Sequence, residues 1–83
     1  ITNNTALEFS ISPNPNNGSF DIEMPILYEN TTVEILDLSG KIIFSEKLLQ
    51  KKQRLDINNI SRGGYLISVH QNGNTKTEKL IIK

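Results

Sequence analysis

The residues best suited to acid–base or nucleophilic chemistry are few in this chain. His70 is the only histidine, and there is no cysteine. A catalytic triad could therefore use only this histidine. Alternation along the strand predicted around His70 places its imidazole ring on the surface. Glu34, Asp37 and Asp56 could meet in space as a hydrolytic pair, but acids on strand faces are usually just solvated. We therefore expect no catalytic residues and no enzyme activity.

An oxygen-rich loop is the second place where chemistry could occur. Residues 13–18 have the sequence Pro-Asn-Pro-Asn-Asn-Gly. Calcium sites use several carboxylates, whereas this loop offers amides and is followed by its first acid only at Asp21. The prolines fix φ, and Asn and Gly accept positive φ. We interpret the loop as a rigid turn and expect neither a metal ion nor a cofactor.

Positive charge is concentrated in one short stretch, at Lys47, Lys51, Lys52 and Arg54. An anion-binding role and a solvated hairpin loop are both consistent with it, and the loop is favoured. The formal net charge of the whole chain is zero. This balance argues against the basic stripe needed for nucleic acid or an anionic membrane.

The size of the chain limits it to one domain. With 83 residues it can form one small core. Without cysteine it is neither a disulfide scaffold nor a zinc ribbon. No apolar run approaches the roughly 20 residues that span a bilayer, so we expect no transmembrane segment. The start Ile-Thr-Asn-Asn resembles neither a signal peptide nor a natural first residue, so we expect a piece of a longer chain.

Short segments in which apolar and polar residues alternate indicate half-buried strands. Phe20, Ile22 and Met24 share one face of their segment, for example, and Glu46 predicts an edge strand or a bulge. Seven strands are predicted, over residues 8–12, 19–24, 32–38, 41–48, 54–57, 65–71 and 75–82. Their number and spacing, without helices, favour an all-β antiparallel two-sheet sandwich.

The connections carry strong turn signals. Ser39-Gly40 predicts a tight turn, and Asn72-Gly73 predicts a hairpin between the last two strands. The segment 56–65 ends one strand, turns at two glycines and opens the next strand with Tyr65. This pattern is typical of a tyrosine corner, in which the hydroxyl bonds to backbone upstream.

The chain ends on a continuous apolar run between two lysines, Lys79-Leu80-Ile81-Ile82-Lys83. Such a run is either a core strand or a strand that waits for a partner. Both interpretations can hold at once.

These segments together resemble the type A C-terminal sorting domain of the Bacteroidetes type IX secretion system, also known as the Por secretion system. The resemblance covers nearly the whole chain. Two positions depart from the family pattern: Ile11 stands where an aromatic residue is frequent, and Gly64 where a larger residue is usual. The matching residues are Pro13, Asn14, Pro15, Gly18 and Phe20 in the opening motif, Gly40 and Lys41 in the central turn, Asp56, Gly63 and Tyr65 in the corner, and Lys79, Leu80, Ile81, Ile82 and Lys83 at the end.

The resemblance implies a seven-stranded immunoglobulin-like antiparallel β-sandwich that directs a cargo protein across the outer membrane. Residues 1–7 would be a linker and residues 8–83 the sorting domain. The implied partners are the secretion machinery, including an outer-membrane shuttle and a sortase-like protease, and a cargo linked to the N-terminus. The domain would be a monomer that passes through the periplasm to the cell surface or medium. Lys79 to Lys83 would be recognised by the machinery, and cleavage would fall in or before residues 2–5.

Two other classes of protein compete with this interpretation. A carbohydrate-binding or adhesion sandwich needs exposed aromatic faces, but the chain has no Trp and most of its five other aromatic residues stand at positions that suit a core. A passive spacer would tolerate any change at the C-terminus. The aromatic residues concerned are Phe9, Phe20, Tyr28, Phe44 and Tyr65.

Overall fold

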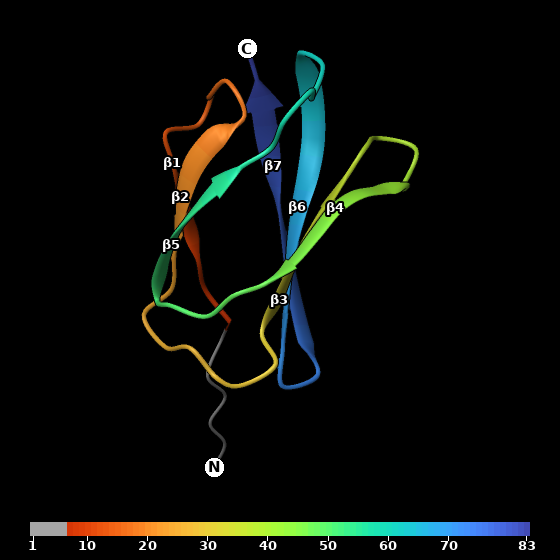
Figure 1. Ribbon diagram of the computed structural model, residues 1–83. Coiled ribbons are helices and arrows are strands. Elements are labelled where there is room, and N and C mark those ends of the chain that lie inside the picture. The colour runs from red at the N-terminus through yellow and green to blue at the C-terminus, as the bar shows by residue number, and fades with distance from the viewer. Residues whose placement is uncertain (1–6) are drawn as a thin grey trace.

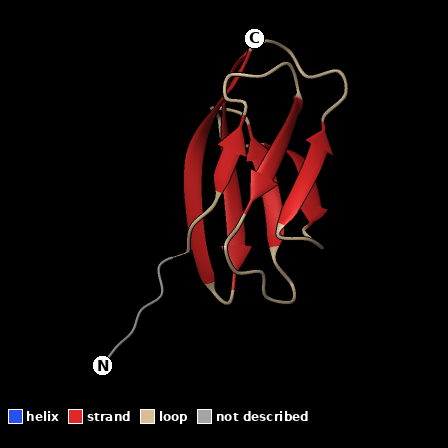
Figure 2. Cartoon of the chain, turned by 90° about the vertical axis from the view of Figure 1, so that its left-hand side faces the viewer, coloured by secondary structure: helices blue, strands red, loops and turns tan. Residues whose placement is uncertain are grey.

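The computed structural model describes residues 7–83, and within them the chain is all β, with two antiparallel sheets (Figures 1 and 2). One sheet has the order β1-β2-β5 and the other the order β4-β3-β6-β7. No helix among these residues could cross a membrane. The predicted seven-stranded sandwich is confirmed. The strands are β1 (Ser10–Ser12), β2 (Ser19–Glu23), β3 (Thr32–Leu36), β4 (Ile42–Lys47), β5 (Lys52–Asp56), β6 (Gly63–Gln71) and β7 (Asn74–Ile82).

The order of the strands is immunoglobulin-like. Hairpins join β1 to β2, β3 to β4 and β6 to β7, and the chain changes sheet after β2, β4 and β5. In the immunoglobulin scheme β4 takes the C′ position, because it pairs with β3 in the sheet that also holds β6 and β7.

The core lies between the sheets because alternate residues of each strand face inward. Phe20 of β2 lies opposite Leu55 of β5, and Ile35 of β3 lies opposite Ile67 of β6. All four are almost fully buried. The buried apolar residues are Phe9, Phe20, Ile22, Met24, Val33, Ile35, Leu48, Leu55, Ile67, Val69, Leu80 and Ile82.

Strand β4 departs from the predicted alternation. Simple alternation predicts that Ile42 shares a face with Phe44 and Glu46. This prediction is wrong, because Ile42 lies on the opposite, outer face. The register shifts between Ile35 and Leu36, so that Ile42 lies opposite the outward-facing Leu36. The extra residue is a bulge, which alternation cannot reveal.

Glu46 confirms the predicted edge strand. It lies opposite the buried Val33 and therefore on the inner side of β4. Its Oε2 accepts a hydrogen bond of 3.0 Å from Nε2 of Gln53 in β5. β4 and β5 are edge strands of different sheets, so this bond joins the two sheets along one side. An inward-pointing charge on an edge strand opposes pairing with other chains.

Gly18 should be the glycine least tolerant of substitution. Its φ is +109°, and an added Cβ would lie 2.9 Å from the carbonyl oxygen of Ile57. We expect Gly18→Ala to lower the free energy of unfolding by about 2 kcal/mol or more. Gly73→Ala is the control, because Gly73 also has a positive φ, of +78°, but an added Cβ there would meet no atom within 4 Å. This substitution should lower the free energy of unfolding by about 1 kcal/mol. Chemical denaturation measures both, and equal losses would contradict the steric argument.

Candidate functional site

The four motifs of the sequence converge on one end of the sandwich, which we call the distal end. Figure 1 shows that the loop after β1, the turn after β3, the segment between β5 and β6 and the C-terminus all lie there. The first described residues, at the red start of the coloured ribbon, lie toward the opposite end. Residues separated by up to 70 positions are thus brought together.

The loop 13–18 lies along the outer edge of β7 and bonds to it. The Asn14 side chain donates from Nδ2 to the Lys79 carbonyl and accepts from the Ile81 amide, each at 3.0 Å. The Asn16 backbone adds two hydrogen bonds. The Asn16 N–H donates to the Ile81 carbonyl at 3.0 Å, and the Asn16 carbonyl accepts from the Lys83 N–H at 2.8 Å. We call these four hydrogen bonds the edge clamp.

The edge clamp determines what the terminal segment displays. Leu80 and Ile82 are 0% and 3% exposed and belong to the core. Ile81 is half-buried, and Lys79 and Lys83 are exposed. From the Lys79 carbonyl to the Lys83 amide, the outward backbone groups of β7 are already bonded, so in the folded chain these four groups are not free for strand addition by a partner. Of the two sequence interpretations, the core strand is confirmed.

The opening motif also connects the distal end to the rest of the fold. The Gly18 carbonyl accepts from the Ile57 amide at 2.8 Å. Ser19 Oγ donates to Asp56 Oδ1 at 2.6 Å, and Phe20 enters the core. Asp56 is therefore a cross-strand partner of Ser19 rather than a member of a carboxylate pair.

The predicted tyrosine corner is confirmed. Tyr65 Oη donates to the Ser61 carbonyl at 2.6 Å, four residues upstream. Gly63 lies within the corner, between Ser61 and Tyr65, with a φ of +144°, and an added Cβ would meet open space. The corner fixes the crossing segment above the start of β6, beside Leu80, which lies opposite Tyr65.

A second local network forms the turn after β3. Asp37 Oδ1 accepts hydrogen bonds from the Ser39 N–H and Oγ and from the Lys41 N–H, at 2.6 to 3.0 Å. Gly40 takes a φ of +93° there. The Ser39 hydroxyl, followed by the Lys41 amide, holds the pKa of Asp37 below its ordinary value. The Lys41 side chain itself is exposed.

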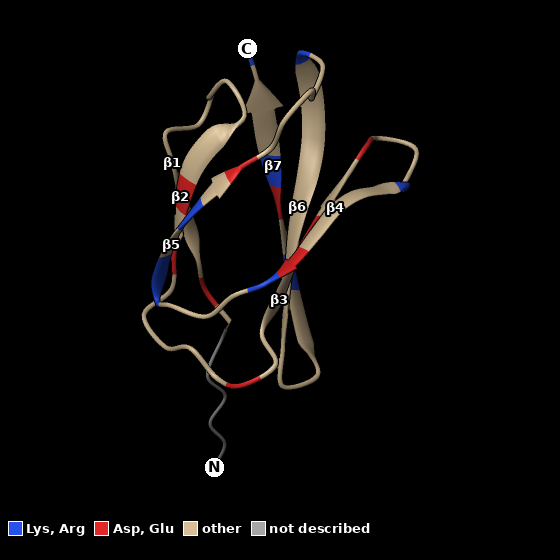
Figure 3. Ribbon diagram, viewed as in Figure 1, with Lys and Arg blue, Asp and Glu red and all other residues tan. Residues whose placement is uncertain are grey.

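The remaining polar candidates do not assemble a reactive centre in the described part of the chain. His70 lies on the outer face, as predicted, with Nε2 2.9 Å from Glu34 Oε1 and Nδ1 2.9 Å from Thr75 Oγ1. Arg54 pairs with Asp21 at 3.0 Å. Charges of both signs are spread over the strands (Figure 3). No group of three metal-ligating side chains occurs within residues 7–83.

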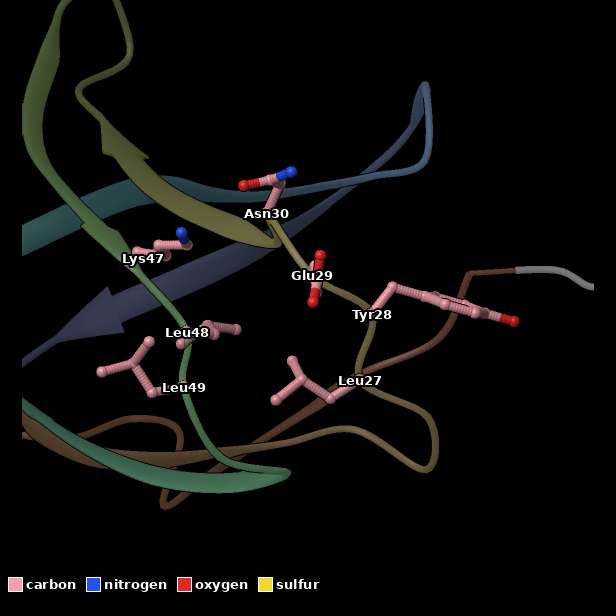
Figure 4. A pocket seen from close by; sticks show the side chains of 7 residues that line it. All are labelled: Leu27, Tyr28, Glu29, Asn30, Lys47, Leu48 and Leu49. Atoms are coloured by element: carbon pink, nitrogen blue, oxygen red, sulfur yellow. The ribbon is translucent and has the colours of Figure 1, made fainter.

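A hollow lies at the end opposite the C-terminus (Figure 4). It encloses about 480 Å³ between the loop after β2 and the chain after β4. Its walls combine apolar side chains with Lys47 and Glu29. Its lining contains no histidine, serine, threonine or cysteine, and so it offers no Ser–His or Cys–His pair.

Fold and site together define a class: an immunoglobulin-like sandwich whose last strand is built into the core and covered at its edge. The sequence profile described as "Secretion system C-terminal sorting domain" matches residues 10–83. The chain belongs to this family. It is therefore a type IX C-terminal sorting domain, of a kind that is attached to exported cargo. A search of curated proteins finds no match.

One similar solved structure is PorZ, an essential bacterial surface component of the type IX secretion system of Porphyromonas gingivalis. The TM-score is 0.75 at 15% sequence identity, over 90% of this chain. At this identity the likeness shows the fold alone. The matched region is 11% of the PorZ chain, so this chain spans about a tenth of that protein.

The edge clamp predicts a measurable role for Asn14. Asn14→Ala removes both side-chain bonds to β7 and should destabilise the domain by about 1 to 2 kcal/mol. Asn14→Asp keeps the acceptor for the Ile81 amide but places an oxygen against the Lys79 carbonyl, so it should also destabilise the domain. Asn17→Ala, which loses only a local bond to Ser19, is the matched control. Thermal unfolding tests this, and a loss for Asn14→Ala no larger than for Asn17→Ala would contradict the clamp.

The turn at Asp37 predicts a dependence on acid. Because folding lowers the pKa of Asp37, its contribution to stability is complete above the unfolded pKa of about 4 and is lost as the pH falls through the lower folded pKa. Asp37→Asn should flatten this part of the stability curve. An NMR titration of the Asp37 carboxyl measures the shift directly, and a pKa at or above the unfolded value would refute it.

Proposed function

We propose that this domain is recognised while folded, at its distal end, by an outer-membrane shuttle of the type IX machinery. The observation that carries the proposal is the convergence there of the motif residues, which the edge clamp and the tyrosine corner hold in place. Lys79 and Lys83 stand on either side of Ile81 on this surface. The covalently attached N-terminal cargo is carried with the domain from the periplasm across the outer membrane.

The terminal segment has two separable roles in this proposal. Leu80 and Ile82 fill the core and so keep the domain folded. Lys79, Ile81 and Lys83 remain accessible and make the contacts with the machinery. Deleting residues 79–83 would remove both roles at once, and is therefore a poor test of recognition.

Cleavage is assigned to the opposite end. A sortase-like protease would cut in or before residues 2–5, in the linker 1–7, which lies almost wholly outside the described residues. The first described residues lie toward the end opposite the C-terminus (Figure 1). A shuttle at the distal end would contact the domain away from these residues. The cargo is then anchored at the cell surface or released, and the domain of residues 8–83 is discarded.

Export of a reporter tests the proposal. Residues 1–83 are fused to the C-terminus of a periplasm-targeted fluorescent protein in a Bacteroidetes host, with the type IX pathway intact or disabled. We expect export only with the pathway intact. Lys79→Gln with Lys83→Gln should reduce export at least about fivefold, since both charges lie on the proposed contact surface.

The control is Lys51→Gln with Lys52→Gln, which removes the same charge from β5 and the loop before it. Its export should equal that of the unsubstituted domain. Equal losses from both pairs would indicate a general effect of net charge, and retention of the reporter in the periplasm of both hosts would refute the sorting role.

A further inference from the structure

The outer face of the four-stranded sheet, the side turned away from the core, is divided into two halves. Nearer the N-terminal end, its residues are polar and bonded to one another. Ser68 and Thr77 share a hydrogen bond of 2.7 Å, and His70 bonds to both Glu34 and Thr75. This is the ordinary solvated face of an antiparallel sheet.

Toward the distal end the same strands become apolar. In β3 the outward residues change from Glu34 to Leu36, and in β6 from Ser68 to Leu66. Leu38 and Ile42, in and beyond the turn after β3, are 70% and 50% exposed. We call the following five residues the outer patch: Leu36, Leu38, Ile42, Leu66 and Ile81.

Register places these side chains next to one another. Leu36 lies opposite Ile42 on one side and Leu66 on the other. Ile81 lies opposite Gly64. A Cβ on Gly64 would meet only the Cδ1 of Leu38, at 3.9 Å. Gly64 therefore adds no side chain to this face next to Leu38.

The charges around the outer patch are mostly positive. Lys79 lies opposite Leu66, Lys41 adjoins Ile42 and Lys83 ends the chain next to Ile82. One carboxylate, Asp37, lies in the neighbouring turn and keeps its negative charge, with three hydrogen bonds to its Oδ1. A contiguous apolar area with a charged rim marks a protein interaction site.

We propose that the outer patch docks a protein of the secretion machinery whose contact surface is apolar at its centre and acidic at its rim. The inference rests on the proposed sorting function and extends its contact surface from the C-terminal segment to β3, β4 and β6. A symmetric dimer would bring the lysine rim of one copy against that of the other, which is unfavourable. An acidic partner instead neutralises these lysines as the apolar centre is buried.

The test compares two pairs of substitutions in the reporter fusion. Leu38→Ser with Ile42→Thr removes the most exposed part of the outer patch. The control is Leu49→Ser with Ile26→Thr, at residues that are 72% and 46% exposed and lie outside the patch. We expect the first pair to reduce export about tenfold, as loss of two central apolar contacts does at an interface. The control pair should be exported normally, and thermal unfolding of both should show a folded domain.

The possible outcomes separate the hypotheses. Normal export of both pairs, with an exported unsubstituted fusion, would overturn the outer patch and leave the sorting function intact. Failure of the unsubstituted fusion would reject both. Sedimentation that shows a dimer broken only by the first pair would assign the patch to a second copy. Binding to phosphatidylglycerol vesicles that is lost only in the first pair would assign the outer patch to lipid. Either of these last two results would overturn the proposal that the patch docks a protein of the machinery.

Discussion

The distal end depends on the closure of one strand edge. An edge strand presents unpaired amides and carbonyls, and a sandwich that leaves them open can pair with other chains. Here Asn14 and Asn16 occupy the edge of β7 at Lys79, Ile81 and Lys83. The clamp ties the loop 13–18 to β7, while the pairing of β7 with β6 fixes the direction of the terminal side chains. Leu80 and Ile82 then face the core, and Ile81 and the two lysines face outward.

The other sheet edges in the described residues are protected by different means. β1 has three residues and so offers a short edge. β4 turns Glu46 inward, where Gln53 of β5 bonds to it across the space between the sheets. A domain that must stay separate from its neighbours during export benefits from closed edges. Recognition by a partner would then use a surface other than this strand edge, and the distal end is the surface that we propose.

Features that depend only on neighbouring residues were predicted well from the sequence. Alternation located all seven strands, and the Asn-Gly and Ser-Gly pairs located their turns, because both signals involve neighbouring residues. The tyrosine corner was also predictable, since the hydroxyl reaches only four residues back. Strand ends were less certain: β1 begins at Ser10 and β5 at Lys52, where pairing with β2 rather than composition sets the boundary.

Other features depend on which strands pair, which one sequence does not specify. Asn14 bonds to residues 65 and 67 positions away. The sequence therefore showed that Asn14 belongs to a motif, but not that its side chain bonds to β7. The bulge between β3 and β4 places Ile42 opposite Leu36 and so turns the Ile42 side chain outward. The outer patch likewise emerges only when β3, β4, β6 and β7 lie side by side. Family resemblance identified several of these positions without revealing their physical roles.

Amide hydrogen exchange of the isolated domain tests the central claim most directly. The clamp bonds the N–H groups of Asn16, Ile81 and Lys83, whereas the amide of Thr77 points to the same side of β7 by alternation and lies beyond the loop. The account predicts that the first three exchange far more slowly than Thr77. Exchange of Ile81 and Lys83 as fast as that of Thr77 would show that the edge is open in solution, and would contradict the clamp.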